Sequence, residues 1–108
     1  MRTVTERGIS VATFVIARVT VTDQTRYRAH ERELLCAARL HSGNVLAAAS
    51  EVETVEGSWD ASRTIIIEFE THESAAEWTE AQRVLRRTQR TRSAITDMIL
   101  LDGNAAST

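Results

Sequence analysis

Residues 63–70 read RTIIIEFE, and this stretch decides the fold. Its β-branched and aromatic residues predict a buried strand. Because side chains alternate along a strand, Ile65, Ile67 and Phe69 share one face, whereas Ile66 lies on the other. A sheet that contains this strand therefore carries apolar side chains on both of its faces.

Five further elements surround this strand. The residue patterns predict strand, helix, strand, strand, helix and strand at Thr13–Val21, about Asp23 to His41, Asn44–Ser50, Arg63–Glu70, Thr71 or Ser74 to about Arg92, and Ala94–Leu101. Asp23 is the expected N-terminal cap of the first helix, and Gly43 is its expected C-terminal cap. Residues 51–56 alternate and are expected to extend the second strand, and GSWDAS at 57–62 is expected to turn the chain into a hairpin.

The order β-α-β-β-α-β predicts a ferredoxin-like fold of the α+β class, an antiparallel sheet with both helices on one face. The 108 residues are expected to form a single domain, residues 1–108, with a core at about 13–103 and frayed ends.

The last strand also has two apolar faces, because Ile95, Ile99 and Leu101 oppose Met98 and Leu100. Two helices can cover only one face of the sheet. Soluble monomers seldom leave a large apolar patch bare, so we expect a second copy to cover the other face about a two-fold axis. The sequence alone therefore predicts a homodimer.

Composition excludes several classes of function. The formal net charge is −2, which argues against a nucleic-acid partner bound through net charge. All 13 basic residues are arginine, so a lysine Schiff base and a P-loop lysine are excluded. No apolar run is long enough for a membrane span, and no membrane partner is expected.

Cysteine and histidine usage argues against a metal site. Cys36 is the only cysteine; it is expected to be a small buried hydrophobe, and it cannot form an intrachain disulfide. A chain without disulfides fits a reducing compartment, and we expect a cytoplasmic protein. His30, His41 and His72 lack the close spacing of a helical zinc motif, so no metal is expected. The function expected below requires no organic cofactor either.

A family resemblance rests on a series of short motifs. They are IARVTVTD with Tyr27 after it, Leu46, VEGSWDASRTIIIEF, AAEW, and Asp97 ahead of Asp102-Gly103. Over residues 13–103 the chain resembles the domain of unknown function 1330 family, which belongs to the dimeric α+β barrel superfamily. The resemblance implies the ferredoxin-like fold and a sheet-to-sheet dimer. Relatives in that superfamily include cofactor-independent monooxygenases, isomerases, cyclases and haem enzymes.

The chain departs from the family pattern where a pocket is expected. The differing positions are Gln24 in place of Pro, His30 in place of a common Tyr, Ser42-Gly43 in place of paired glycines, Ala48-Ala49-Ser50 in place of an Arg-Gly-Gly-like stretch, Thr79 in place of Tyr, and Val84 in place of the Tyr of a Ser-Pro-x-Tyr segment. These changes predict a reshaped pocket.

Tyr27 and His30 are the first candidates for catalysis. They lie three residues apart on one helix, so their side chains can be neighbours. Histidine titrates near neutral pH and can act as general acid or base, with the phenol orienting a substrate oxygen. The alternative is a core tyrosine with a wet tip and a histidine at the helix margin.

Charged residues within apolar patterns complete the candidate site. Asp97 is the third catalytic candidate, and its alternative is an ion pair at the wet end of its strand. Glu31 is expected to pair with Arg18 or Arg63, or to serve the site. Arg63 is a candidate for a substrate carboxylate, and its alternative is a hairpin anchor.

Arg18, Glu31, Arg63 and Trp78 are therefore the candidate substrate-binding residues. Trp78 fits a pocket wall or plain core equally well. Tyr27, His30 and Trp78 are expected to line one cavity with at least one of Arg18, Arg63 and Asp97.

Four arginines of the second helix form a stripe on one side, at Arg83, Arg86, Arg87 and Arg90. With Glu73, Glu77 and Glu80 upstream, they complement the helix dipole. Like charges four residues apart repel, so an acidic patch of the partner subunit or an anionic ligand is an alternative explanation.

The function expected from these observations is a homodimeric, cofactor-independent small-molecule enzyme. It would catalyse an acid/base isomerisation or cyclisation in a pocket between sheet and helices, with His30 transferring the proton. The alternatives are a cofactor-free monooxygenase of the same fold and a non-catalytic ligand-binding or interaction module.

Overall fold

The computed structural model describes residues 12–88 and 93–103. Its elements are β1 (Thr13–Val21), α1 (Gln24–Leu40), β2 (Gly43–Ala49), β3 (Arg63–Phe69), α2 (His72–Thr88) and β4 (Ala94–Asp102). The predicted order is confirmed, and with it the ferredoxin-like α+β fold. Residues 89–92, where the second helix was expected to end, lie outside the described residues.

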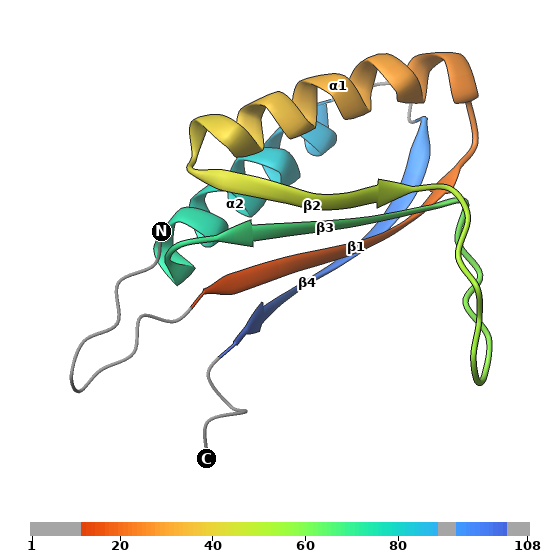
Figure 1. Cartoon of the computed structure of the whole chain (residues 1–108). Coiled ribbons are helices and arrows are strands. Elements are labelled where there is room, and N and C mark those ends of the chain that lie inside the picture. The colour runs from red at the N-terminus through yellow and green to blue at the C-terminus, as the bar shows by residue number, and fades with distance from the viewer. Residues whose placement is uncertain (1–11, 89–92, 104–108) are drawn as a thin grey trace.

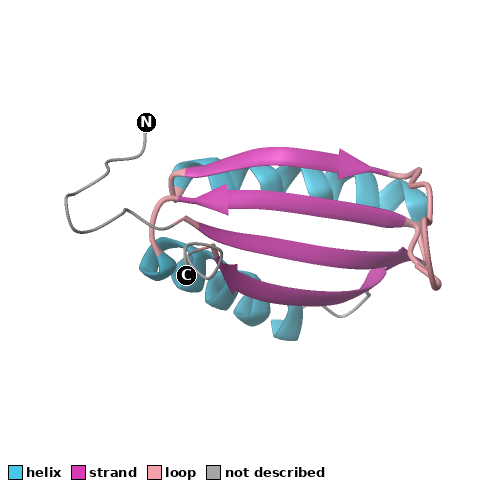
Figure 2. Cartoon of the chain, turned by 60° about the horizontal axis from the view of Figure 1, so that its bottom comes forward, coloured by secondary structure: helices cyan, strands magenta, loops and turns pink. Residues whose placement is uncertain are grey.

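The four strands form one antiparallel sheet in the order β2-β3-β1-β4. Both helices lie on one face of this sheet, as Figure 1 shows from the side. Figure 2 shows the sheet from its other face, with no helix in front of it. We call these the covered face and the open face.

The start of α1 follows the sequence prediction, whereas its end differs. Asp23 is the N-terminal cap, and its Oδ1 accepts a hydrogen bond from the backbone N–H of Arg26 at 3.1 Å. The expected C-terminal cap, Gly43, is instead the first residue of β2, and the left-handed residue is Ser42 with φ 68°. Gly43 is needed for space, because a Cβ there would lie 2.7 Å from the carbonyl oxygen of Ala38.

The extension of the second strand over residues 51–56 is wrong. β2 ends at Ala49, opposite Thr64, and residues 50–62 leave the sheet as a loop that hangs beyond the open face (Figure 1). Extended strands at this point would form a two-stranded ribbon without a covering layer, which is marginal in water. Val55 in this loop is 92% exposed.

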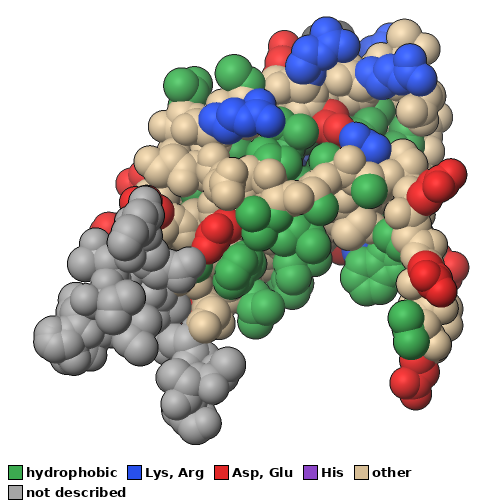
Figure 3. Space-filling model, in the orientation of Figure 1, with side chains coloured by type: hydrophobic (Ala, Val, Ile, Leu, Met, Phe, Trp, Pro, Cys, Tyr) green, Lys and Arg blue, Asp and Glu red, His purple; other side chains and the backbone are tan. Residues whose placement is uncertain are grey.

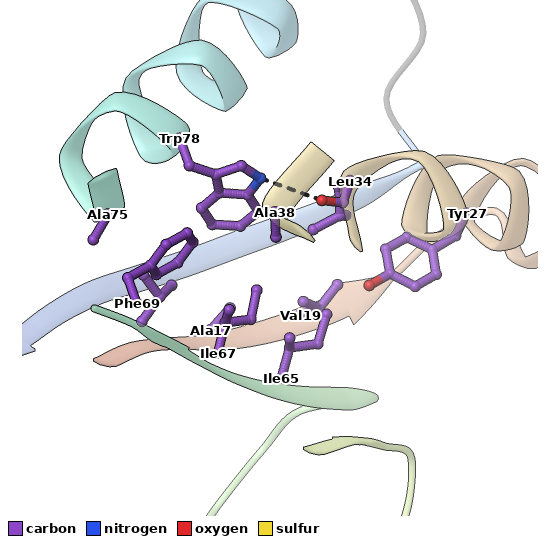
Figure 4. Packing of buried hydrophobic residues seen from close by; sticks show 11 residues of the cluster. Ala17, Val19, Tyr27, Leu34, Ala38, Ile65, Ile67, Phe69, Ala75 and Trp78 are labelled. Carbon is purple, nitrogen blue, oxygen red and sulfur yellow. Dashed lines mark hydrogen bonds between the residues drawn. The ribbon is translucent and has the colours of Figure 1, made fainter. Parts of the chain in front are cut away.

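The core lies between the covered face and the helices (Figure 4). Val15, Ile67 and Phe69 of the strands are fully buried, and Trp78 of α2 packs on Phe69 with ring centroids 5.7 Å apart. The indole N–H of Trp78 donates to the carbonyl oxygen of Leu34 at 3.2 Å, which ties α2 to α1. A large aromatic side chain with its one polar atom satisfied thus closes the core.

The expected burial of Cys36 is wrong, because this side chain is exposed. The buried residues of α1 are Tyr27, Leu34 and Ala38, spaced seven and four residues apart. Cys36 is two residues from Leu34, which turns it to the solvent side of the helix.

The open face carries the second set of apolar side chains, as predicted. Ile16 of β1 lies opposite Ile66 of β3 and Ile99 of β4. Ile99 is 55% exposed and Leu101 is 49% exposed. Figure 3 shows hydrophobic side chains gathered on this underside of the sheet, next to the hanging loop.

Candidate functional site

A small cavity lies between the covered face and the two helices. Its walls are mainly apolar core side chains, and its polar lining is Tyr27, His30, Gln82, Arg86 and Thr96. The volume is about 20 Å³, which is room for one water molecule. We call this space the inner cavity.

Two polar atoms of these lining residues make no hydrogen bond of good geometry within the described part of the chain. They are the phenolic oxygen of Tyr27 and the amide oxygen Oε1 of Gln82, both buried. A buried polar atom without a partner destabilises the fold by about 1–3 kcal/mol. Tyr27 and Gln82 belong to different helices and line the same cavity. Because both residues line the inner cavity, these two atoms are the buried polar groups that a guest there could bind.

His30 lies beside Tyr27, with ring centroids 6.1 Å apart. Burial, and then the positive charge of Arg86, lower the pKa of His30 below its ordinary value. The imidazole is therefore neutral at physiological pH. Burial, and then the proximity of the Glu31 carboxylate as a hydrogen-bond acceptor and as a negative charge, raise the pKa of Tyr27, so its phenol stays protonated. The phenol thus lies near Glu31, although the two groups do not form a hydrogen bond of good geometry. The cavity thus holds a neutral base beside a phenolic donor.

Of the two partners expected for Glu31, Arg18 and Arg63, the structure shows Arg63. Nε of Arg63 donates to Oε1 of Glu31 at 2.9 Å, and Nη2 donates to Oε2 at 2.7 Å. The remaining Nη1 donates to Oγ of Ser50 at 3.0 Å. These bonds hold the pKa of Glu31 below its usual range. Both side chains line an outer groove beside α1, where Tyr27 contributes to the wall.

Arg18 and Asp97 lie on the open face, so the expectation of one shared cavity is only partly met. Arg18 faces Asp97 across the β1–β4 ladder, with Nη2 3.7 Å from Oδ2, and its guanidinium lies 5.4 Å from the ring centroid of Trp59. Trp59 also donates from Nε1 to Oγ1 of Thr64 at 2.9 Å. Asp97 therefore cannot reach a molecule in the inner cavity, because the sheet separates them.

Tyr27, His30 and Trp78 do meet in the inner cavity, whereas none of Arg18, Arg63 and Asp97 lines it. The alternation of side chains along β4 places Asp97 with Ile95 and Ile99, and the opposite side chains Thr96 and Met98 face the cavity.

Gln82 and Thr96 are the polar cavity residues that the sequence patterns did not reveal. Gln82 lies four residues after Trp78, so helical spacing was the available signal. The arginine stripe of α2 divides in a similar way. Arg86, four residues after Gln82, lines the inner cavity, whereas Arg83 pairs outside with Glu80 at 2.8 Å. Arg90 lies outside the described residues.

Within residues 12–88 and 93–103, no three side chains of His, Cys, Asp or Glu come together as metal ligands. Neither helix in the described part of the chain has the length and apolar character that a bilayer crossing requires.

The pattern of the family described as domain of unknown function (DUF1330) matches residues 12–104. Among curated proteins, no relative matches the chain. The family match spans both helices and all four strands, so it includes every residue of the inner cavity.

Proposed function

The chain belongs to the domain of unknown function 1330 family, and on this premise we propose that it is a homodimeric enzyme acting by proton transfer on a small molecule held between sheet and helices. The observation that carries this proposal is the pair of unsatisfied buried atoms, Tyr27 Oη and Gln82 Oε1, in one cavity with His30. Folding alone gives no reason to keep both atoms unpaired, because apolar residues of similar size would pack there more stably.

Each polar group has a distinct role in the proposed reaction. Neutral His30 accepts a proton from the substrate as general base, and it returns that proton to a second substrate atom. Tyr27 donates a hydrogen bond to the substrate oxygen on which negative charge develops. Gln82 Oε1 accepts a hydrogen bond from a substrate hydroxyl or amine. Such a sequence is an isomerisation or cyclisation without net redox change, and it uses only side chains of the protein.

Entry of a substrate requires the inner cavity to widen, since its volume of about 20 Å³ holds one water. The hydrogen bond from Trp78 to the Leu34 carbonyl spans the seam between α1 and α2. We propose that the entrance forms at this seam, when this hydrogen bond breaks and α1 moves away from α2.

The homodimer is part of the same proposal. Ile16, Ile66 and Ile99 form a cross-strand row on the open face, and a second copy about a two-fold axis would cover them. Two sheets packed in this way are the arrangement of the dimeric α+β barrel superfamily. Light scattering at micromolar concentration should give about twice 12.0 kDa. A stable, well-folded monomer at that concentration would contradict the dimer.

The test of the site uses variants that remove the unsatisfied atoms. Gln82→Met and Tyr27→Phe should unfold at equal or higher temperature than the wild type, because each removes an unpaired buried oxygen. Both variants should lose the small-molecule hits that a thermal-shift screen of metabolites finds for the wild type. The control is Thr25→Met on the exposed first turn of α1, which lines neither the inner cavity nor the outer groove and should keep those hits. Loss of stability without loss of hits would refute the proposed site.

The chemistry is tested once a hit is turned over. His30→Ala should lower turnover roughly 10²–10⁴-fold, the usual contribution of a positioned general base. Oxygen consumption during turnover would replace the isomerase or cyclase reaction with that of a cofactor-free monooxygenase.

The small volume of the inner cavity favours one further candidate, a non-catalytic interaction module with the same dimeric architecture. A metabolite screen without hits, together with an intact dimer, would favour this module over the enzyme.

A further inference from the structure

We propose that the outer groove beside α1 is a second binding site, for a small molecule that carries two or more phosphoryl or carboxylate groups. The groove has a volume of about 480 Å³ and opens to solvent. Arg28, Arg32 and Arg39 line it, with Ser50 at the end of β2. This proposal is independent of the reaction proposed for the inner cavity.

The three arginines lie on one side of α1. Arg32 is four residues after Arg28, and Arg39 is seven residues after Arg32, which are spacings of one helical face. None of the three has a hydrogen-bond or ion-pair partner among the described residues. By contrast, Arg26 on the same helix is paired with Asp23 at 3.2 Å. Figure 3 shows basic side chains along the top of α1 and above β2.

Nothing in the described lining of the groove compensates this charge. Its one carboxylate is Glu31, and both oxygens of Glu31 accept hydrogen bonds from Arg63. That pair is neutral overall, and its side chains are 12% and 25% exposed, so it forms a fixed floor. Three positive charges thus face one hollow in a chain whose formal net charge is −2. A concave surface of one charge sign concentrates the counter-ion that fits it.

The chemistry of the lining selects the class of ligand. A guanidinium group binds phosphate or carboxylate through two parallel hydrogen bonds. Arg28 and Arg32 are separated by about 6 Å along the helix axis, which suits two adjacent anionic groups of one molecule. Leu35 and the ring of Tyr27 provide an apolar wall for the rest of that molecule. The hollow shape favours a compact ligand over an extended polymer.

The experiment is calorimetric titration of the full chain with sodium pyrophosphate and, separately, with sodium citrate at fixed ionic strength. We expect saturable binding of at least one of them, and comparison of the two distinguishes phosphoryl from carboxylate ligands. Affinity should fall as sodium chloride is raised, because the arginines are exposed. No saturable binding of either anion up to 10 mM, roughly the weakest affinity a specific site would show, would overturn the proposal.

A matched pair of double variants separates the groove from general surface charge. Arg28→Gln with Arg32→Gln should weaken binding roughly tenfold or more. The control is Arg83→Gln with Arg87→Gln on α2, which has the same spacing and removes the same charge from exposed positions. The control should bind as the wild type does. Equal weakening by both double variants would show non-specific attraction and overturn the site. If the groove variant does not fold, Arg39→Gln provides the same comparison with a single exposed side chain.

Two further readouts keep this site distinct from the inner cavity. Amide shifts on titration should concentrate on α1 and around Ser50 and Arg63, and Gln82→Met should leave the affinity unchanged, because Gln82 does not line the groove. Loss of anion binding in Gln82→Met would overturn the separate site. A single-stranded oligonucleotide that binds far more tightly than pyrophosphate would overturn the small-molecule class.

Discussion

The covered and open faces of the sheet are built from the same strands, yet they differ in how far the chain itself completes them. Ile67 of β3 is fully buried under the helices, whereas its neighbour Ile66 is half-buried on the open face. Ion pairs follow the same division. Glu31 and Arg63 on the covered side are joined by two short hydrogen bonds, whereas Arg18 and Asp97 on the open face are 3.7 Å apart and exposed. The open face thus carries apolar side chains like those of a protein core, but the chain itself does not cover them.

The largest difference between the faces should appear when an isoleucine is truncated. Ile67→Ala should lower the free energy of unfolding by about 2–5 kcal/mol, because it leaves a cavity in a closed core. Ile66→Ala should lower it by less than about 1 kcal/mol in the dissociated protein, since water already contacts this side chain. Urea denaturation at submicromolar concentration measures both values. Equal losses would mean that the faces are equally closed within one chain.

A charge on the open face tests what covers it. Ile66→Glu should weaken the proposed dimer about a hundredfold or more, because a carboxylate of each copy would be buried without a partner between the two sheets. Ile66→Val should remain dimeric and serves as the control. Sedimentation across a concentration series gives both dissociation constants. A dimer that tolerates Ile66→Glu would have to use another surface.

A smaller difference in stability is expected between substitutions in the two ion pairs. Glu31→Gln should lower the free energy of unfolding by about 1.5–3 kcal/mol at neutral pH, since it removes a charged hydrogen-bond partner of Arg63. Asp97→Asn, which alters only an exposed pair with Arg18, should cost less than about 1 kcal/mol.

The difference in the free energy of unfolding between wild type and Glu31→Gln should also depend on pH. The pKa of Glu31 is lowered in the folded state, so its contribution is present above the unfolded-state pKa and is lost as pH falls through the folded-state pKa. Wild type and Glu31→Gln should therefore converge in stability below about pH 4. Parallel stability curves through that range would contradict the assignment.

The smallest expected effect is the titration of His30. Because the pKa of His30 is lowered in the folded state, protonation favours unfolding. The wild type should therefore lose stability relative to His30→Gln as pH falls below about 6.5. A midpoint for the imidazole below its ordinary value in an NMR titration would agree, and a midpoint above it would contradict the assigned environment.

The fold could be predicted from the sequence because its elements have strong periods. The alternation in β3 predicted both faces, and the capping residue Asp23 predicted the start of α1. The end of β2 was not predictable from local pattern, because alternation in residues 51–56 says nothing about whether a covering layer exists. The sequence predicted a structural need for glycine at position 43, as a helix cap. The actual reason is that the carbonyl oxygen of Ala38 and the ring of Phe69 lie too close for a side chain there, and a local pattern does not reveal such contacts.

The candidate site was harder to predict than the fold. Tyr27 and His30 follow from spacing within one helix, whereas their meeting with Gln82 and Arg86 depends on how α2 packs across the sheet. Asp97 was predicted to be catalytic because a carboxylate interrupts an apolar strand. That pattern does not show which face of the sheet holds the pocket. Charged residues on a two-sided apolar sheet are therefore assigned to a site only after the helices are placed.

The strand order determines whether either half of the chain could form part of the sheet without the other half. The loop of residues 50–62 divides the sequence into a segment with β1, α1 and β2 and a segment with β3, α2 and β4. Every ladder of the sheet, β2 with β3, β3 with β1 and β1 with β4, joins a strand of one segment to a strand of the other. Neither segment contains a pair of neighbouring strands, so neither can form any part of this sheet by itself. A protease cut at the exposed Val55 would leave two fragments interleaved strand by strand, and the same topology makes the chain suited to fragment complementation, in which separately expressed halves regain structure only on meeting.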